Sequence, residues 1–235
     1  FGTLLGGWLM GYSNGITLVS AVLIALAVAG WLSSHRIPEA PATAPDLKLN
    51  WNPVTETWRN VMFLRGHRAV LNSVLGISWF WFFGSIFLAQ LPNYTRLYLG
   101  GDQSVAPLVL MLFAFGIGAG SLLCEVFSRR TVEIGLVPLG ALGMTIFGAD
   151  LYFARPSMAA VSGLNWQQFL SSPGNLRLCF DLLMIGVSGG FFTVPLYALI
   201  QQRTPRERLS RAIAANNILN ALFMVVAAAM AVALF

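Results

Sequence analysis

The chain has very little charge for its length. Only 14 Lys and Arg and 9 Asp and Glu occur among 235 residues, so 10% of the chain is charged, against about 25% in an average soluble protein. Apolar residues make up 57% of the sequence, and the mean hydropathy is +0.71. So few charged groups cannot cover the surface of a water-soluble domain of this size. The composition therefore excludes that class and indicates a polytopic membrane protein.

Cysteine and histidine are also scarce. Cys124 and Cys179 lie inside apolar stretches, which predicts two buried, inert thiols and no disulfide framework. Neither of the two histidines, His35 and His67, is followed five residues later by Asp. The His-xxxx-Asp arrangement that supplies a general base in soluble acyltransferases is therefore absent. With so few ligand-type side chains we expect no metal site, no cofactor and no enzyme activity in this sequence.

Long apolar runs dominate what is present. A helix needs about 20 apolar residues to cross about 30 Å of hydrocarbon. By this measure the sequence predicts the tail of one span and six further spans, at Phe1–Met10, Ile16–Leu32, Ala69–Leu91, Val105–Phe127, Val132–Phe153, Leu176–Ile200 and Ala212–Phe235. The expected fold class is all-α, a polytopic helical membrane protein. We expect the sequence to be cut within an apolar stretch at each end.

Basic residues are divided unequally between the connecting loops. Eleven lie on one side, namely Arg36, Lys48, Arg59, Arg65, Arg68, Arg129, Arg130, Arg203, Arg206, Arg208 and Arg211. Only Arg96, Arg155 and Arg177 lie on the other side. Because Lys and Arg are enriched in cytoplasmic loops, we expect the basic side to face the cytoplasm and the loop with Trp166 to lie outside. Cys124 and Cys179 should then lie near opposite membrane faces.

The connector over residues 33–68 has two parts. The segment Pro38–Pro45 is rich in Pro and Ala and predicts an extended spacer. Asn52 and Pro53 then form an N-cap followed by proline in the first helical turn. Val54 and Trp58 open an apolar pattern at helical spacing, which predicts an amphipathic helix at the cytoplasmic interface. A solvated loop is the alternative.

Two groups of spans joined by a long connector resemble the two halves of a major facilitator superfamily (MFS) transporter. Residues 1–32 would be the end of the N-terminal half (the tail of helix 5, and helix 6), residues 33–68 the central cytoplasmic connector, and residues 69–235 helices 7–11 of the C-terminal half. The segments Gly186–Gln201 and Ala212–Asn217 resemble the lysophospholipid transporter family. Gly76–Phe82 and Val132–Pro138 resemble its branch fused to acyltransferase and acyl-carrier-protein ligase domains.

This resemblance implies a function and a location. It implies a carrier that moves an amphiphile, most consistently lysophospholipid, from the outer to the inner leaflet of the bacterial cytoplasmic (inner) membrane by alternating access. The partners would be membrane lipid, the lysophospholipid, and acyltransferase and ligase domains on the same full-length chain, with no nucleic acid. Two alternatives stay open, an ion-coupled carrier of a small solute or drug, and a membrane anchor that transports nothing.

Charged groups inside spans cost about 2.5–3.5 kcal/mol each on insertion scales, so they are candidate functional residues. Glu125, Arg129, Arg130 and Glu133 cluster at cytoplasmic span ends and would form a gate of ion pairs. An interfacial charge cluster that anchors the loop is the alternative. The superfamily's loop signature appears only loosely in this stretch.

Two further acidic residues lie toward the outer ends of spans. Asp181 has Arg177 four residues earlier, and we favour a local ion pair between them over a proton or substrate site. Asp150 lies near the end of its span, where we expect solvation at the interface.

Polar and aromatic residues supply the candidate cavity lining. Asn216 and Asn220 share one helix face and would either line the cavity or hydrogen-bond to a neighbouring helix. Gln90 and Asn93 would either meet a headgroup or form a polar helix end. Trp79 belongs to an aromatic-rich stretch that suits an acyl-chain groove, with plain lipid contact as the favoured alternative.

Three glycine pairs have the small-xxx-small spacing that allows helices to approach closely, namely Gly7 with Gly11, Gly116 with Gly120, and Gly186 with Gly190. In the superfamily, helices 5 and 8 pack across the two halves. The resemblance therefore implies that the first two pairs form a sliding seam between the halves. Static packing explains the same glycines.

Overall fold

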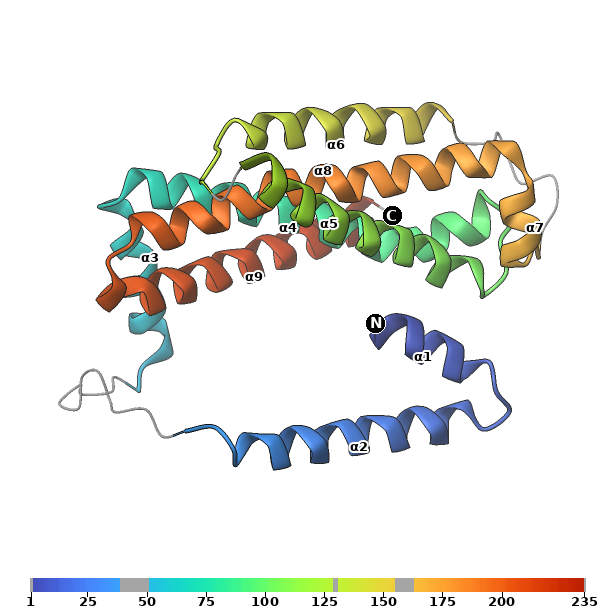
Figure 1. Cartoon of the computed structure of the whole chain (residues 1–235), viewed down its shortest axis with the longest axis horizontal. Coiled ribbons are helices and arrows are strands. Elements are labelled where there is room, and N and C mark those ends of the chain that lie inside the picture. The colour runs from blue at the N-terminus through green and yellow to red at the C-terminus, as the bar shows by residue number, and fades with distance from the viewer. Residues whose placement is uncertain (1, 39–50, 129–130, 155–162, 235) are drawn as a thin grey trace. The chain divides into compact units, whose positions relative to one another are not determined.

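The computed structural model describes residues 2–38, 51–128, 131–154 and 163–234, and it divides the chain into two units, residues 1–51 and 52–235. Unit 1 holds α1 (Gly2–Met10) and α2 (Gly15–Ser34), which contact each other across a short turn (Figure 1). Gly11 lies in that turn rather than on α1. The predicted Gly7/Gly11 pair therefore does not form one helix face. The Pro-Ala spacer lies outside the described residues.

Unit 2 consists of α3 (Pro53–Arg65), α4 (Arg68–Leu97), α5 (Val105–Ser128), α6 (Leu136–Phe153), α7 (Trp166–Ser171), α8 (Pro173–Arg203), the 3-10 turn η1 (Arg206–Arg208) and α9 (Leu209–Leu234). Six helices in the described ranges are long and apolar enough to cross a membrane, namely α2, α4, α5, α6, α8, and η1 with α9. The predicted fold class, an all-α polytopic membrane protein, is confirmed.

Several predicted boundaries need correction. The fifth span starts at Leu136 rather than Val132, because a turn in which the Leu136 N–H donates to the Glu133 carbonyl precedes the helix. α4 continues past Pro92 to Leu97, and Thr95 donates its hydroxyl to the Pro92 carbonyl there. α8 starts at Pro173, because a proline is tolerated in the first helical turn. The polar loop before α8 also contains the short helix α7.

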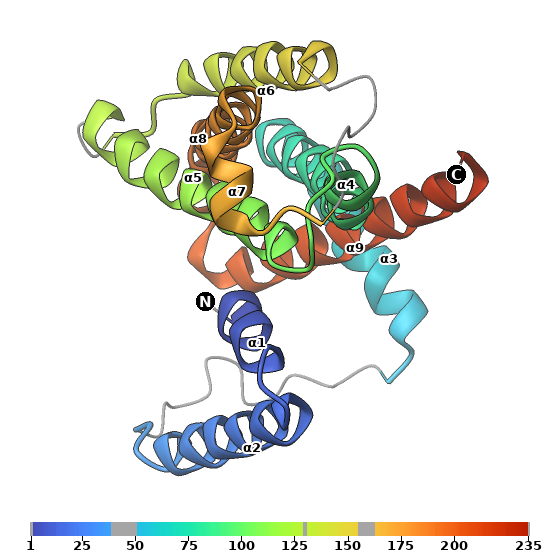
Figure 2. The same cartoon turned by 90° about the vertical axis from the view of Figure 1, so that its right-hand side faces the viewer.

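α8 is the central helix of unit 2. It packs against α5 on one side and α4 on another, α6 covers a third side, and α4 in turn packs against α9 (Figure 2). Two buried apolar clusters follow from this arrangement. Phe169, Leu178 and Ile185 belong to the cluster near α7, whereas Ile77 and Phe192 belong to the cluster at the opposite end. α8 contributes to both clusters, so its packing holds the unit together.

The two ends of unit 2 differ in character. The loop after α4 and the loop before α7 are joined by backbone hydrogen bonds, from Asp102 N–H to the Leu164 carbonyl (2.8 Å) and from Leu164 N–H to the Gly100 carbonyl (2.9 Å). We call the end of unit 2 that holds these two loops the α7 end. The start of α4 and the junction of α8 with α9, which carries Arg203, lie at the opposite, basic end (Figure 1). The spans therefore alternate in direction as the loop charges predicted.

α3 forms at the predicted cap. The Asn52 side chain accepts hydrogen bonds from the N–H groups of Val54 (3.1 Å) and Thr55 (3.3 Å). Leu64 is fully buried among residues of α4 and α9, while Trp58 is 62% exposed. α3 is thus a docked helix with one apolar face against α4 and α9 and a second apolar edge left uncovered.

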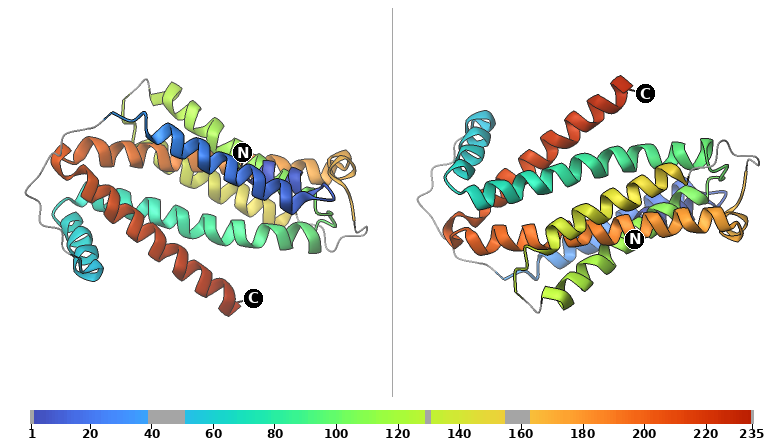
Figure 3. Two further views of the ribbon diagram at one scale, coloured as in Figure 1. Left: turned by 90° about the horizontal axis from the view of Figure 1, so that it is seen from below. Right: turned by 90° about the horizontal axis from the view of Figure 1, so that it is seen from above.

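α9 follows α4 along its first half and then diverges from the rest of unit 2, as both views in Figure 3 show. Its second half leaves large apolar side chains uncovered, including Val225 and Val232. Such a surface is stable in lipid or against another helix.

Candidate functional site

An apolar groove lies between α4 and α6, with α8 as its floor. α4 and α6 make little direct contact, and two adjoining cavities of about 330 and 190 Å³ occupy the space between them. Both cavities share Trp79 and Phe83, so they form one groove, which we call the aromatic groove. Its lining residues are Trp79, Phe80, Phe82, Phe83, Ile86, Phe87, Gln90, Leu91 and Tyr94 from α4, Ala141, Met144, Thr145, Gly148, Leu151 and Tyr152 from α6, and Phe192 from α8.

The aromatic groove carries isolated polar groups along its length. Trp79 lies near the middle of α4, and Gln90 lies eleven residues later, about 16 Å farther toward the α7 end. The Gln90 amide and the side chain of Tyr94 line that end. Toward the middle the walls are mainly aromatic and aliphatic, with Thr145 as an exception. Ligand pockets in proteins commonly combine apolar walls with a few polar groups in this way.

Four of the six candidate cavity residues take different places. Asn220 is buried, and its Oδ1 accepts a hydrogen bond from the Ser78 hydroxyl (2.9 Å), which joins α9 to α4. Asn216 is also buried, its amide donates to Asn217 Oδ1 (3.3 Å), and its own Oδ1 has no partner among the described residues. Asn93 is exposed at the α7 end, and Asp181 lies between α6 and α8. Of the six candidates, Trp79 and Gln90 line the aromatic groove.

A second polar contact joins α4 to α8. The Trp81 indole N–H donates to the Tyr197 hydroxyl (3.5 Å). Together with the Ser78–Asn220 bond, this contact fixes α4 between α8 and α9. Sequence reasoning missed Ser78 and Tyr197, because a single hydroxyl in an apolar run carries no pattern that reveals its partner.

The glycine pairs of α5 and α8 face each other. A Cβ atom on Gly116 would lie 3.0 Å from the Cα of Gly186, and one on Gly190 would lie 2.7 Å from the carbonyl carbon of Gly120. No side chain fits between these backbones. Gly116 and Gly120 therefore pack against α8 within unit 2. Gly140 on α6 makes a similarly close approach, with its Cβ position 2.6 Å from Phe192 N.

The acidic residues near the α7 end also correct a prediction. Arg177 pairs with Asp150 on α6, through Nε to Oδ2 at 3.0 Å and through a second contact between Nη2 and Oδ1. It does not pair with Asp181, as the i−4 spacing suggested. The pairing depends on how α6 and α8 face each other, and local spacing does not contain that information.

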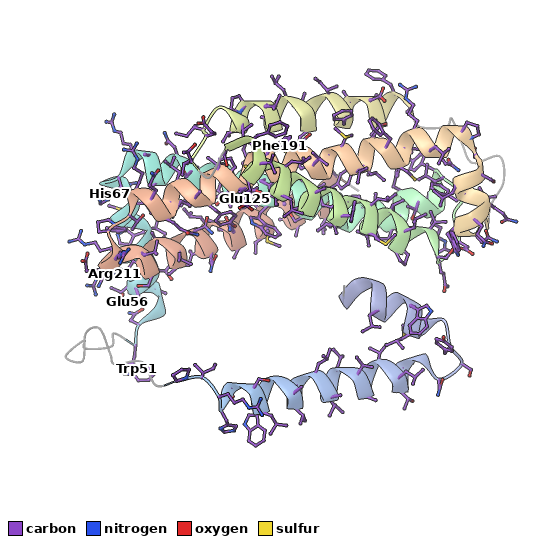
Figure 4. The ribbon with its side chains drawn as sticks, viewed as in Figure 1. Trp51, Glu56, His67, Glu125, Phe191 and Arg211 are labelled. Atoms are coloured by element: carbon purple, nitrogen blue, oxygen red, sulfur yellow. The ribbon has the colours of Figure 1, made fainter. Side chains whose placement is uncertain are left out.

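The proposed gate is described only in part. Glu125 is exposed on the last turns of α5, and Arg211 and His67 lie farther toward the basic end (Figure 4). Glu133 lies in the turn before α6, where Thr131 donates its hydroxyl to Glu133 Oε1 (3.2 Å). The other two members of the gate, Arg129 and Arg130, lie outside the described residues. The cysteines are both free and buried, Cys124 near the end of α5 and Cys179 near the start of α8.

No metal-binding group of three or more His, Cys, Asp or Glu side chains occurs within the described parts of the chain. The aromatic groove is lined mainly by apolar side chains, with isolated polar groups among them.

Comparison with known proteins agrees with this chemistry. The chain is 30% identical over 223 residues to the lysophospholipid transporter LplT of Cronobacter sakazakii, covering 92% of this chain and 50% of that protein. It is 28% identical over 215 residues to LplT of Klebsiella pneumoniae subsp. pneumoniae, covering 86% of this chain and 46% of that protein. The chain thus spans about half the length of the curated relatives it matches. No solved structure gives a significant match.

Residues 1–228 match the family described as Major Facilitator Superfamily. The match covers both units, and the long apolar helices of the structure agree with it. The chain therefore belongs to the major facilitator superfamily of membrane transporters.

Proposed function

We propose that this chain is part of a carrier that moves lysophospholipid from the outer to the inner leaflet by alternating access. The observation that carries the proposal is the similarity to lysophospholipid transporters over 92% of the chain. The aromatic groove adds physical support, because it offers an apolar trough along α4 from Trp79 to Tyr94, with the Gln90 amide near one end.

The orientation of the lipid follows from the groove. The basic end would face the cytoplasm, since its loops carry most of the Arg and Lys. The α7 end, with Gln90, would then lie at the outer surface, where an outer-leaflet headgroup is found. The chain of that lipid would extend inward along Phe83 and Trp79. Burial of each methylene contributes about 0.8 kcal/mol relative to water, but lipid offers nearly the same environment, so the groove would select shape rather than provide strong affinity.

Transport would use unit 2 as one rigid half. The glycine seam between α5 and α8 and the two polar contacts of α4 hold the helices in fixed register. A rocking motion against the other half would expose the bound amphiphile to each leaflet in turn. Attachment to acyltransferase and ligase domains stays a prediction.

The test uses the full-length protein in inverted and right-side-out membrane vesicles, with radiolabelled lysophosphatidylethanolamine as the probe. In both kinds of vesicle we expect the protein to move the lipid from the leaflet that faces outward in the cell to the cytoplasmic leaflet. The Trp79→Ala variant should do so at a several-fold lower rate. Leu122→Ala is the matched control, because Leu122 is 68% exposed on α5 and lies outside the groove. Equal movement with and without the protein would reject the flippase proposal and favour a membrane anchor that transports nothing. Movement of a small solute alone would favour the ion-coupled carrier.

The groove itself is tested by crosslinking. A photoreactive group on the acyl chain should label the α4 and α6 walls, and excess unlabelled lysophospholipid should suppress the labelling. If transport persists while the label reaches neither wall, the groove is occupied by another segment of the full-length chain and the lipid binds elsewhere.

A further inference from the structure

Three charged groups meet between α6 and α8 near the α7 end. Asp150 comes from α6, and Arg177 and Asp181 come from α8, one helical turn apart. The Arg177 guanidinium is bonded to Asp150 on both of its carboxylate oxygens. Among the described residues, two acidic groups therefore lie beside one basic group, and Arg177 pairs with Asp150 rather than with Asp181.

Asp181 is far more buried than its neighbours. Its exposed fraction is 1%, and its Oδ2 atom has no hydrogen-bond partner among the described residues. It faces a cavity between α6 and α8 with Asp150 and Arg177 on one side and apolar side chains, among them Ile146 and Phe180, on the other. An ionised carboxylate with a buried oxygen that lacks a hydrogen bond, beside the carboxylate of Asp150, is strongly disfavoured, so this environment favours the protonated acid.

The position along the helix allows exchange with water. α8 is about 45 Å long, and Asp181 lies eight residues, about 12 Å, from its start. The hydrocarbon layer is about 30 Å thick. A centred helix would thus place Asp181 just inside the hydrocarbon boundary at the α7 end. A proton can reach this carboxyl group from that surface, while the group stays largely removed from water.

Within the part of the chain that the structure describes, the other helices around α8 add no further charge to this cavity. From α6 the group that faces this cavity is Asp150, and from α8 it is Arg177. α5 and α7 contribute apolar residues to the adjoining cluster, such as Val109 and Phe169, and its titratable members are Cys179 on α8 and Tyr94 on α4. A metal ion is disfavoured, because the described residues around the cavity offer only two carboxylates and no third ligand-type side chain.

We propose that Asp181 is a proton-binding site whose occupancy decides which carboxylate Arg177 holds. With the proton bound, Arg177 ties α8 to Asp150 on α6. When the proton leaves to the water at the α7 end, Asp181 becomes an anion four residues from Arg177, on the same helix face. The guanidinium then turns to Asp181, and the tie between α6 and α8 is released at this end. This inference rests on the packing of unit 2 and holds whether or not the carried molecule is a lysophospholipid.

The test measures protonation directly, without transport. The full-length protein in native membranes is treated with dicyclohexylcarbodiimide, which reacts with protonated carboxyl groups in apolar surroundings, and labelling is mapped by mass spectrometry across a range of pH. We expect the peptide that contains Asp181 to be labelled at acidic pH and to lose the label as pH rises. The Asp181→Asn variant should lose it entirely.

The Asp150→Asn variant sharpens the result. It removes the first partner of Arg177 and leaves the guanidinium free to stabilise the Asp181 anion, so Asp181 should lose its label at a lower pH than in the unsubstituted protein. Glu56 is the negative control, since it pairs with Arg59 on the docked helix α3, and it should stay unlabelled with or without Asp150→Asn. Absence of label on Asp181 at acidic pH, or label that Asp150→Asn leaves unchanged, would overturn the proposal. Label that sodium suppresses at constant pH would assign the site to a cation instead.

Discussion

The two sides of α8 differ in how closely the neighbouring helices approach. On the α5 side, glycines bring two backbones together until no side chain fits between them. On the other side, α4 and α6 stand apart and leave the aromatic groove over α8. Water does not drive helices together inside lipid, so close association depends on backbone contact and polar bonds. The difference separates the part of unit 2 that fixes its structure from the part that is free to hold a ligand.

The largest effect is expected in the glycine seam. Gly120→Leu would place a side chain where a Cβ atom already comes within 2.8 Å of the Val187 carbonyl carbon. Backbone cannot move aside easily, so we expect a loss of at least about 3 kcal/mol in the free energy of unfolding. Unfolding by SDS titration measures this change. Gly118→Leu is the control, because Gly118 lies on the same helix with no atom within 4 Å of its Cβ position. Equal stability of the two variants would contradict the close seam.

A smaller effect is expected where a side chain, rather than backbone, fills the space. A methyl group in Gly143→Ala would overlap the Ser188 hydroxyl and lie 3.0 Å from its Cβ. Because the hydroxyl can rotate, we expect a cost of about 1 kcal/mol. Adding Ser188→Gly should restore most of the lost stability, measured by the same titration. No recovery in the double variant would show that α6 packs elsewhere.

These two glycine sites also show how much of the helix packing could be predicted from the sequence. Small-residue spacing revealed that close seams exist, and apolar length located Val105–Ser128 with an error of one residue. The partners of each seam, and the pairing of Arg177 with Asp150, depend on how the helices rotate against each other. Spacing along one helix holds no information on that rotation. The α6 wall of the aromatic groove was missed for the same reason, although Trp79 and Gln90 were predicted from their own helix.

The polar contact between α4 and α9 should contribute less than either glycine site. A double-mutant cycle of Ser78→Ala and Asn220→Ala isolates their hydrogen bond. Such bonds average about 0.6 kcal/mol in membranes, because each group finds other partners when the contact is lost. We expect a coupling energy of that size in the unfolding titration. A coupling energy near zero would assign the burial of Asn220 to packing alone.

The smallest effect on stability is expected inside the aromatic groove. Gly148 lines the groove, and no atom lies within 4 Å of its Cβ position. Gly148→Leu should therefore change the free energy of unfolding by less than about 0.5 kcal/mol. It should nevertheless lower lysophospholipid uptake in the vesicle assay, since the new side chain fills the trough. The same substitution at Gly118 should leave uptake unchanged, and normal uptake by Gly148→Leu would separate the groove from transport.

The central position of α8 has a consequence for how the protein is made. Its neighbours α4, α5, α6 and α7 all precede it in the chain, so they leave the ribosome first. α8 carries two glycines, Gly186 and Gly190, that lie against the α5 backbone, and it carries Arg177, which is tied to α6. We expect the earlier helices to associate at the insertion site before α8 is inserted. The neighbours that α8 packs against would then be in place when this central helix enters the bilayer.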